Sequence, residues 1–303
     1  MATVTANRPS TSVASSVPAT RRRRRRGRGA PIGPAMWVAV VVVVLFVLLP
    51  IAWMLLSSFK GPASIGTTSI LPHPWTTSNY VSAFGGNGSG DTSGRYILNS
   101  VIVAVSTTAL VLVLGTLAGY GLGRMPMRGK LPLMMVLLMI SVFPAIAVIA
   151  PLFLIMKSIG WLNSYQALIL PYTAFNLPFA IWILRNYLMG IPKEMEETGR
   201  IDGASPLRTL WSIILPQALP GLFTAGIFTF TACWTEFLMA LSFNSDNNFR
   251  TIPVGISQFG GQYSVPYGMY FATSCVAAIP IAVLVLVFRK SVVSGLTSGA
   301  VKG

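Results

Sequence analysis

Long runs of apolar residues, separated by short polar segments, dominate the pattern of this chain. Each run holds about 20 residues, the length at which an α-helix crosses roughly 30 Å of hydrocarbon. The six runs cover residues 37–59, 101–122, 131–156, 167–188, 220–243 and 270–288. Strands of a membrane β-barrel would alternate polar and apolar positions, whereas stretches such as VAVVVVVLFVLL do not. The pattern therefore predicts an all-α membrane protein with six transmembrane helices.

The fourth run, 167–188, is the least regular of the six. It contains Pro171, Asn176 and Pro178. Prolines inside a membrane helix are tolerated where neighbouring helices or a cavity satisfy the backbone groups that they free. We therefore expect this span to lie where other helices or a cavity take up its freed backbone groups.

Composition excludes a soluble enzyme and most metal sites. Of 303 residues, 53% are hydrophobic and 10% are charged, against about 25% charged residues in ordinary soluble domains. Seven acidic residues, one His and two Cys are too few for a multi-carboxylate or His-rich metal site or a disulfide framework. No cofactor or metal is expected on this chain.

Lys and Arg are distributed unevenly between the two sides of the predicted membrane domain. With the N-terminus inside, 18 of the 22 basic residues fall in inside segments. Because basic residues accumulate in cytoplasmic segments, this predicts a multi-pass membrane protein with both termini cytoplasmic. The net charge of +15 then reflects topology and contact with anionic headgroups. Nucleic-acid binding is not expected, because no aromatic platform accompanies the arginines.

The same pattern divides the chain into four parts. Residues 1–34 read as a disordered, Arg-rich cytoplasmic tail. Residues 35–95 hold the first transmembrane helix and an extracytoplasmic loop, and 96–290 form the transmembrane core. Residues 291–303 form a cytoplasmic C-terminal tail.

The most informative polar segment lies between the fourth and fifth runs, at 191–221. Pro192 suits the first position of a helix, and three glutamates at 194, 196 and 197 suit its positive N-terminal end. Gly203 should break this helix. Ser205 then suits an N-cap, with Pro206 at the first helical position.

The second short helix should be amphipathic. Leu207, Leu210, Trp211 and Ile214 fall at i, i+3, i+4 and i+7, which predicts one apolar face. This face either packs under the protein's own membrane domain or docks into a groove on a cytoplasmic partner.

A family resemblance favours docking. The residues Glu197-Thr198-Gly199, then Asp202-Gly203-Ala204, then Ile213-x-Leu215-Pro216 resemble the EAA loop of permease subunits of binding-protein-dependent ABC importers. That pattern is Glu-Ala-Ala, Asp-Gly-Ala and Ile-x-Leu-Pro. Thr198 and Gly199 replace the two alanines; both are small, although Gly199 should weaken the first helix by up to ~1 kcal/mol.

The resemblance extends over most of the chain after the tail and points to the carbohydrate-uptake branch. Trp234-Thr235-Glu236-Phe237 resembles that branch, and the closing 295–303 is similar to the C-terminus of its maltose- and trehalose-type G/B subunits. The resemblance implies the type I importer permease fold with a cytoplasmic coupling-helix loop. It also implies a location in the bacterial cytoplasmic (inner) membrane. The partners that it implies are a different second permease, two copies of an ABC ATPase and an extracytoplasmic solute-binding protein, together with the lipid bilayer and a sugar substrate.

The substrate that the resemblance implies is a disaccharide or oligosaccharide, moved by alternating access. The chain contains no G-x-x-x-x-G-K-[ST] motif, so ATP and Mg²⁺ belong on the partner ATPase and this subunit is not itself an enzyme. The resemblance assigns ATPase coupling to seven residues. They are Glu197, Asp202, Gly203, Ala204, Arg208, Leu215 and Pro216.

A substrate path through the membrane is predicted from polar residues in the spans. Glu236 is the only acidic residue within a predicted span, and an intramembrane carboxylate is costly enough to suggest a function. Trp234 offers an aromatic face for a sugar, and Asn176 is a weaker candidate. The alternative is that Glu236 is structural and bonds to a neighbouring helix.

Three other functions remain open at this point. The same permease fold could import a non-sugar solute, although no span carries a Lys or Arg away from its ends to meet a phosphate. An ion-coupled secondary transporter would usually place several ionisable residues at the midplane. An intramembrane enzyme would need more chemistry than one carboxylate supplies.

Overall fold

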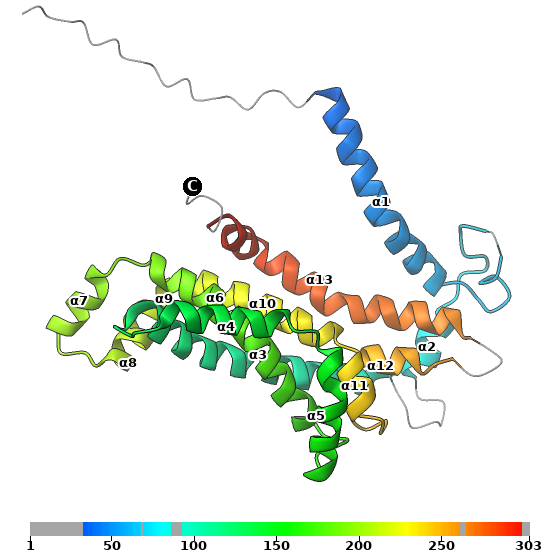
Figure 1. Cartoon of the computed structure of the whole chain (residues 1–303). Helices are drawn as coiled ribbons and strands as arrows, with labels where there is room; N and C mark the ends of the chain where they lie inside the picture. The colour runs from blue at the N-terminus through cyan, green and yellow to red at the C-terminus, as the bar shows by residue number, and fades with distance from the viewer. Residues whose placement is uncertain (1–32, 68, 86–92, 261–264, 299–303) are drawn as a thin grey trace, which may run out of the picture. The chain divides into compact units, whose positions relative to one another are not determined.

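The structure is a computed structural model that describes residues 33–67, 69–85, 93–260 and 265–298, with side chains as far as Arg289. Within these ranges the chain is helical and has no β-strand (Figure 1). The helices, in chain order, are α1 (Pro34–Ser58), α2 (Ser78–Phe84), α3 (Ser93–Arg124), α4 (Lys130–Val142), α5 (Ile146–Ser158), α6 (Gln166–Gly190), α7 (Glu194–Ile201), α8 (Pro206–Thr209), the π-helical turn η1 (Leu210–Ile214), α9 (Leu215–Gln217), α10 (Leu219–Thr235), α11 (Leu238–Phe243), α12 (Ile252–Ser257) and α13 (Tyr267–Ser298).

The chain divides into two units, residues 1–48 and 49–303. In the first unit, residues 34–48 form the first part of α1, and their side chains are exposed. A helix that is apolar on all sides and leaves every side exposed suits a lipid environment. Residues 1–32 of the predicted tail lie outside the described residues.

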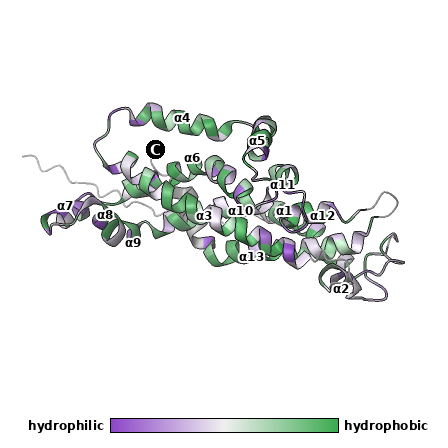
Figure 2. Ribbon diagram, turned by 90° about the horizontal axis from the view of Figure 1, so that it is seen from below, coloured by the Kyte–Doolittle hydropathy of each residue, from purple (hydrophilic) through white to green (hydrophobic). Residues whose placement is uncertain are grey.

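The second unit is built around α3, α6 and α10, which pack against one another. Gly115 and Gly119 of α3 face α6, and a Cβ atom on Gly119 would lie 3.1 Å from the backbone nitrogen of Arg185. Small residues four apart allow two membrane helices to approach closely. Hydrophobic residues predominate in α4 and along much of α3 and α6 (Figure 2), which is the composition expected of helices in lipid.

Four helices are long and apolar enough to cross a membrane unaided, namely α1, α3, α6 and the first part of α13. Two bent helix pairs raise the number to as many as six if each pair counts as one span. The described part of the chain is therefore a multi-helix membrane domain with four to six candidate spans.

The predicted span 131–156 is not one straight helix. It consists of α4 and α5, which meet at an angle of 89°. Phe143 between them is extended (ψ 132°), because the ring of the following Pro144 disfavours the helical conformation of the residue before it. Hydropathy alone did not reveal this bend.

The predicted span 220–243 is also interrupted. α10 ends at Thr235, Glu236 is extended (ψ 135°), and α11 starts at Leu238. The Glu236 carboxylate accepts hydrogen bonds from the amides of Met239 (2.9 Å) and Ala240 (3.1 Å). A polar side chain thus satisfies the amides that a new helix start leaves free.

The fourth run forms one continuous helix despite its prolines. α6 continues through Pro171 and Pro178 from Gln166 to Gly190. Polar side chains bond to backbone carbonyls along it: Thr173 to Ile169 (2.7 Å) and Asn176 to Tyr172 (2.8 Å). Tight packing against α3 and α10 holds the helix together despite its prolines.

The predicted boundary at residue 290 falls inside a helix. α13 continues to Ser298, so the first residues of the predicted C-terminal tail, 291–298, extend this helix. The last five residues, 299–303, lie outside the described residues.

Candidate functional site

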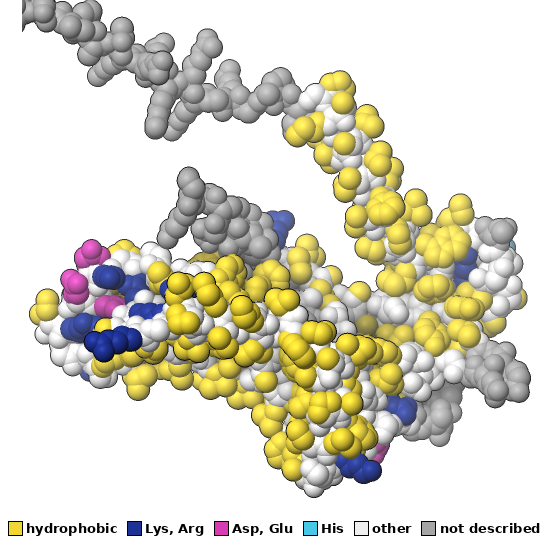
Figure 3. All heavy atoms as spheres, viewed as in Figure 1, with side chains coloured by type: hydrophobic (Ala, Val, Ile, Leu, Met, Phe, Trp, Pro, Cys, Tyr) yellow, Lys and Arg dark blue, Asp and Glu magenta, His cyan; other side chains and the backbone are white. Residues whose placement is uncertain are grey.

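The 191–221 segment forms short helices that meet at a bend, and charged side chains gather at the end of the second unit that holds α7 and α8 (Figures 1 and 3). The amide of Ala204 donates to the carbonyl of Gly199 (2.9 Å), and that of Gly203 donates to the carbonyl of Arg200 (3.0 Å). This pair of bonds is a Schellman motif, which requires a left-handed residue after the helix. Gly203 supplies it with φ of 78°. The predicted bend at Gly203 is confirmed.

The helix after the bend starts where the sequence indicated. Ser205 is extended, its Oγ accepts a hydrogen bond from the amide of Arg208 (3.4 Å), and Pro206 follows at the first helical position. The predicted start of the first helix is wrong by two residues. Its first i→i+4 bond runs from the amide of Glu197 to the carbonyl of Lys193 (3.1 Å), so α7 begins at Glu194 and Pro192 precedes it.

The predicted apolar face of the second helix is divided between interior and surface. Leu210 and Ile214 are fully buried and pack with Tyr120, whereas Leu207 is 58% and Trp211 is 46% exposed. The chain forms a π-helical turn over Leu210–Ile214, and this wider turn changes which residues share a face. The prediction of a single face is therefore wrong: part of it packs under the protein's own helices, and part remains exposed.

The residues expected to couple to an ATPase lie at the surface of this segment. Glu197, Asp202, Gly203, Arg208 and Pro216 are exposed, and Ala204 and Leu215 are half-buried. The charged groups of Glu197, Asp202 and Arg208 form no ion pair with any residue that the structure describes. They are free to meet charges on another molecule.

One buried contact that fastens α7 to the membrane helices was not predicted. Nε of Arg124, the last residue of α3, lies 3.5 Å from Oε1 of Glu196, and the two side chains are 3% and 8% exposed. From the sequence, Arg124 counted only toward membrane orientation, and Glu196 only as an acid in a first helical turn. The two residues lie far apart in the chain, so no local pattern in the sequence linked them.

Gly199 has a use that the family pattern did not suggest. A Cβ atom at this position would lie 2.6 Å from Cδ1 of Ile213 and 3.5 Å from Oγ1 of Thr209. Gly199 therefore lets α7 lie close against the π-helical turn. Glycine at this position lowers the helix propensity of α7, as expected, and at the same time allows α7 to pack more closely on the π-helical turn.

The predicted path residues lie near the break between α10 and α11. Trp234 is only 3% exposed, stacks on Phe230 with ring centroids 5.5 Å apart, and donates its indole N–H to the carbonyl of Ala277 (3.1 Å). Its environment is that of a packed core residue. These contacts cover its indole face, whereas stacking on a sugar would require that face to be exposed.

Glu236 and Asn176 are brought together through a residue that the sequence did not single out. The Tyr172 hydroxyl donates to the Glu236 carboxylate, and the Asn176 amide donates to the Tyr172 carbonyl (2.8 Å) and lies 3.8 Å from Sγ of Cys233. Glu236 thus combines a neighbouring-helix bond with capping of α11. Among the described residues, no group of three or more His, Cys, Asp or Glu could hold a metal ion.

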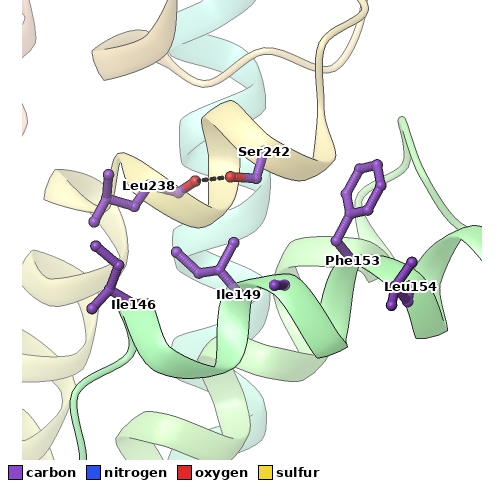
Figure 4. Close-up of a pocket in the computed structure, with 7 residues that line it drawn as sticks. Ile146, Ile149, Phe153, Leu154, Leu238 and Ser242 are labelled. Atoms are coloured by element: carbon purple, nitrogen blue, oxygen red, sulfur yellow. Dashed lines mark hydrogen bonds between the residues drawn. The ribbon is translucent and has the colours of Figure 1, made fainter.

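An open apolar pocket of about 620 Å³ lies between α5 and α11 (Figure 4). Its wall contains one hydroxyl group, which Ser242 donates to the carbonyl of Leu238 (2.7 Å). The lining residues are Ile146, Ile149, Ala150, Phe153, Leu154, Leu238 and Ser242. None of the predicted path residues lines it, and its chemistry suits lipid or another helix better than a sugar.

Comparison with known proteins adds relatives along nearly the whole chain. The chain is 37% identical to the sulfoquinovosyl glycerol transport system permease protein SmoH of Agrobacterium fabrum over 89% of this chain and 94% of that protein. It is 36% identical to the trehalose/maltose transport system permease protein MalG of Thermococcus litoralis, over 88% of this chain and 95% of that protein.

A solved structure supports the same fold. A chain from a bacterial ABC transporter involved in the import of the acidic polysaccharide alginate superposes with a TM-score of 0.73 at 20% identity, covering 84% of this chain and 94% of that one. A family model described as "Binding-protein-dependent transport system inner membrane component" matches residues 111–294. This match includes the 191–221 segment and more than half of the sequence, so the chain belongs to the family of inner-membrane components of binding-protein-dependent transport systems.

Proposed function

We propose that this chain is a permease subunit of an ATP-driven sugar importer and forms half of its translocation path. Family membership supports the transport role. Two relatives named for trehalose/maltose and sulfoquinovosyl glycerol transport support a carbohydrate substrate. The observation that carries the proposal is the 191–221 segment, whose exposed face lacks partners in the part of the chain that the structure describes.

The exposed face of this segment has the composition of a docking surface. Leu207 and Trp211 stand next to a bend at which Ile201 is 86% exposed. Large exposed apolar side chains rimmed by charges are typical of protein interaction sites, and here Glu197 and Arg208 supply such charges. The segment would enter a groove on the ATPase, with Asp202, Gly203 and Ala204 at the bend and Leu215 and Pro216 at its far end.

The assembly that follows has four kinds of chain. This subunit would pair with a different second permease, and the pair would bind two copies of an ABC ATPase and an extracytoplasmic solute-binding protein. ATP and Mg²⁺ would stay on the ATPase, because this chain contains no P-loop sequence. Closure of the ATPases would move the permease helices by alternating access.

The proposed topology has six spans with both termini in the cytoplasm. The excess of Lys and Arg in the segments assigned to the cytoplasm supports it. The proposed domain limits are 1–34, 35–95, 96–290 and 291–303, with the coupling loop at 191–221; α13 runs across the limit at 290 as far as Ser298. The Arg-rich tail would set orientation and contact anionic lipid.

The substrate path is proposed to pass close to Glu236 and Asn176, at the break between α10 and α11. A carboxylate and an amide are hydrogen-bonding groups that suit sugar hydroxyls. Trp234 would support this region from the core, where it stacks on Phe230. The second permease would contribute the remaining contacts.

Co-purification tests the proposal directly. The chain is tagged, native membranes are solubilised gently, and the co-purifying chains are identified by mass spectrometry. We expect a second permease, an ATPase and a solute-binding protein, and ligand screening of the last would identify the sugar. Recovery of this chain alone, also after crosslinking in the membrane, would contradict the importer.

Site-specific crosslinking tests the docking surface itself. A photo-crosslinking amino acid is placed at Leu207 or Trp211 and, as a control, at Val142 of α4, which is 83% exposed. We expect the first two positions to capture the ATPase and Val142 not to. Equal capture from all three positions, or none from Leu207 and Trp211, would show that the segment does not dock there.

A further inference from the structure

One guanidinium group holds three parts of the second unit together at the end of α3. In addition to facing Glu196, Arg124 donates through Nε to the carbonyl of Leu188 (2.9 Å) and through Nη2 to the carbonyls of Leu188 and Ile191. These two carbonyls lie where α6 ends and the linker to α7 begins. We call Arg124, Glu196, Leu188 and Ile191 the ion-pair junction.

A gain in folding stability does not by itself explain why a buried ion pair occupies this position. Removing two opposite charges from water costs about as much as their attraction returns, so a buried ion pair is often replaceable by apolar residues without loss. Glu196 Oε1 accepts no hydrogen bond in the described part of the chain, so its partner there is the nearby Arg124 charge. What Arg124 supplies instead is a defined geometry, because the rigid fork of donors on its planar guanidinium is fixed on the carbonyls of Leu188 and Ile191, with Glu196 beside it.

The ion-pair junction connects the proposed docking face to the membrane helices through a single turn of α7. Glu197 is exposed on one side of this turn, whereas Glu196, its neighbour, is 6% exposed and faces Arg124. α3 and α6, which Arg124 joins, pack against each other and against α10. A displacement of α7 therefore reaches the centre of the membrane domain through Arg124.

We propose that the Arg124–Glu196 ion pair is the joint through which movement of the 191–221 segment is passed to α3 and α6. Arg124 and Glu196 are then positioning residues: they touch neither sugar nor ATP, but keep α7 and the ends of α3 and α6 moving together. The inference rests on the proposed docking of this segment on an ATPase. Without the pair, the ATPase would still bind and hydrolyse ATP, but the membrane helices would follow its motion incompletely.

The test measures coupling rather than activity alone. The complete complex is purified, reconstituted into proteoliposomes with its solute-binding protein, and assayed for sugar taken up per ATP hydrolysed. For Glu196→Gln and Arg124→Gln we expect this ratio to fall about tenfold, within the range found for changes in energetic coupling between sites, while ATP hydrolysis continues. Glu194→Gln and Arg128→Gln are matched controls at exposed positions and should keep the wild-type ratio.

A double variant separates coupling from folding. Arg124→Gln with Glu196→Gln leaves no unpaired buried charge, so it should assemble and regain thermal stability even where a single variant does not. If the pair is a joint, the ratio stays low in the double variant. A ratio that is unchanged in the single variants, or that recovers together with stability in the double variant, would overturn the inference, as would failure of all three variants to assemble.

Failure of the underlying docking proposal would be recognised separately. In that case the wild-type chain would not crosslink to an ATPase from Leu207 or Trp211. A wild-type chain that crosslinks there, with variants that keep the normal ratio, would instead refute the joint alone.

Discussion

The two ends of α3 are fastened to neighbouring segments by different chemistry. At one end Asn99, which is fully buried, donates to the carbonyls of Asn248 and Arg250 (both 2.9 Å) and accepts from the Tyr165 hydroxyl (2.9 Å). Ser100 beside it accepts from the amide of Ile252 (2.8 Å). We call this group the amide junction. The other end is the ion-pair junction.

Both junctions use one α3 side chain to bond two backbone carbonyls, but only the amide junction is complete. Both amide hydrogens and the carbonyl oxygen of Asn99 have partners, whereas Glu196 Oε1 accepts no hydrogen bond in the described ranges. A fully satisfied neutral network holds one position at little cost. A buried ion pair is costly to form and more costly to break, which suits a connection that must stay intact while its surroundings move.

The largest effect should follow from breaking the ion-pair junction on one side. Glu196→Ala leaves the Arg124 charge buried without its partner and should destabilise the fold by about 3–5 kcal/mol. The measurement is the temperature at which the detergent-solubilised complex aggregates, compared with Glu194→Ala at an exposed position of the same helix. Equal midpoints for the two variants would mean that the pair is not buried in the assembled complex.

The amide junction should respond less strongly to the same treatment. Asn99→Ala removes three hydrogen bonds and leaves two carbonyls to find water, at a cost of about 2–4 kcal/mol. The coupling ratio of sugar to ATP should remain at the wild-type value in whatever complex survives, because this junction holds a fixed position. A lowered ratio would remove the distinction between the two junctions.

Whether the sequence predicted a feature depends on how far apart in the chain the interacting residues lie. The bend at Gly203 and the cap at Ser205 follow from neighbouring residues, and both were predicted. The Arg124–Glu196 contact joins residues far apart in the chain, so no local pattern contained it. Similarly, hydropathy identified the apolar run 131–156 but could not show that it turns by 89°, because both shapes have the same composition.

The predicted path residues illustrate the same limit. Hydropathy singled out Glu236 as the one acidic residue in a predicted span, but not Tyr172, whose hydroxyl bonds to it. Trp234 was selected for its aromatic face, which in the structure is packed on Phe230. A residue type indicates what a side chain can do, whereas the direction it faces depends on helices elsewhere in the chain.

Glu236 is intermediate between the amide junction and the ion-pair junction, since it is an acidic side chain whose described hydrogen-bond partners are all neutral. Glu236→Gln keeps the shape but weakens the bonds from Met239, Ala240 and Tyr172, so we expect a loss of about 2 kcal/mol. Sugar transport should fall further than the amount of protein in the membrane. Equal losses in transport and in membrane level would favour a purely structural role for Glu236.

Substitutions at Gly203 change the backbone of the segment that the ion-pair junction fastens to the membrane helices. A Cβ atom has room there, so Gly203→Val should suffer only from the positive φ, at about 1–2 kcal/mol, and should reduce transport by changing the shape of the docking surface. Gly203→Asn is the control, since Asn tolerates this conformation. Transport by Gly203→Val that matches Gly203→Asn would rule out a role for the bend.

The smallest effect is expected at Gly199, where two terms oppose each other. Gly199→Ala restores the alanine of the family pattern and should gain up to ~1 kcal/mol of helix propensity, but its Cβ would meet Cδ1 of Ile213 at 2.6 Å. The atom in the way ends a flexible side chain, so Ile213 takes up part of this overlap and a small shift of α7 takes up the rest, and the net change in stability should be close to zero. The same Cβ would nevertheless push α7 away from the π-helical turn, and Glu196 lies on that face.

Transport should therefore decline slightly in Gly199→Ala and recover when Ile213→Val removes the obstructing methyl group. A decline that persists in the double variant would place the effect in the helix itself, and the close packing of α7 would then have no part in coupling.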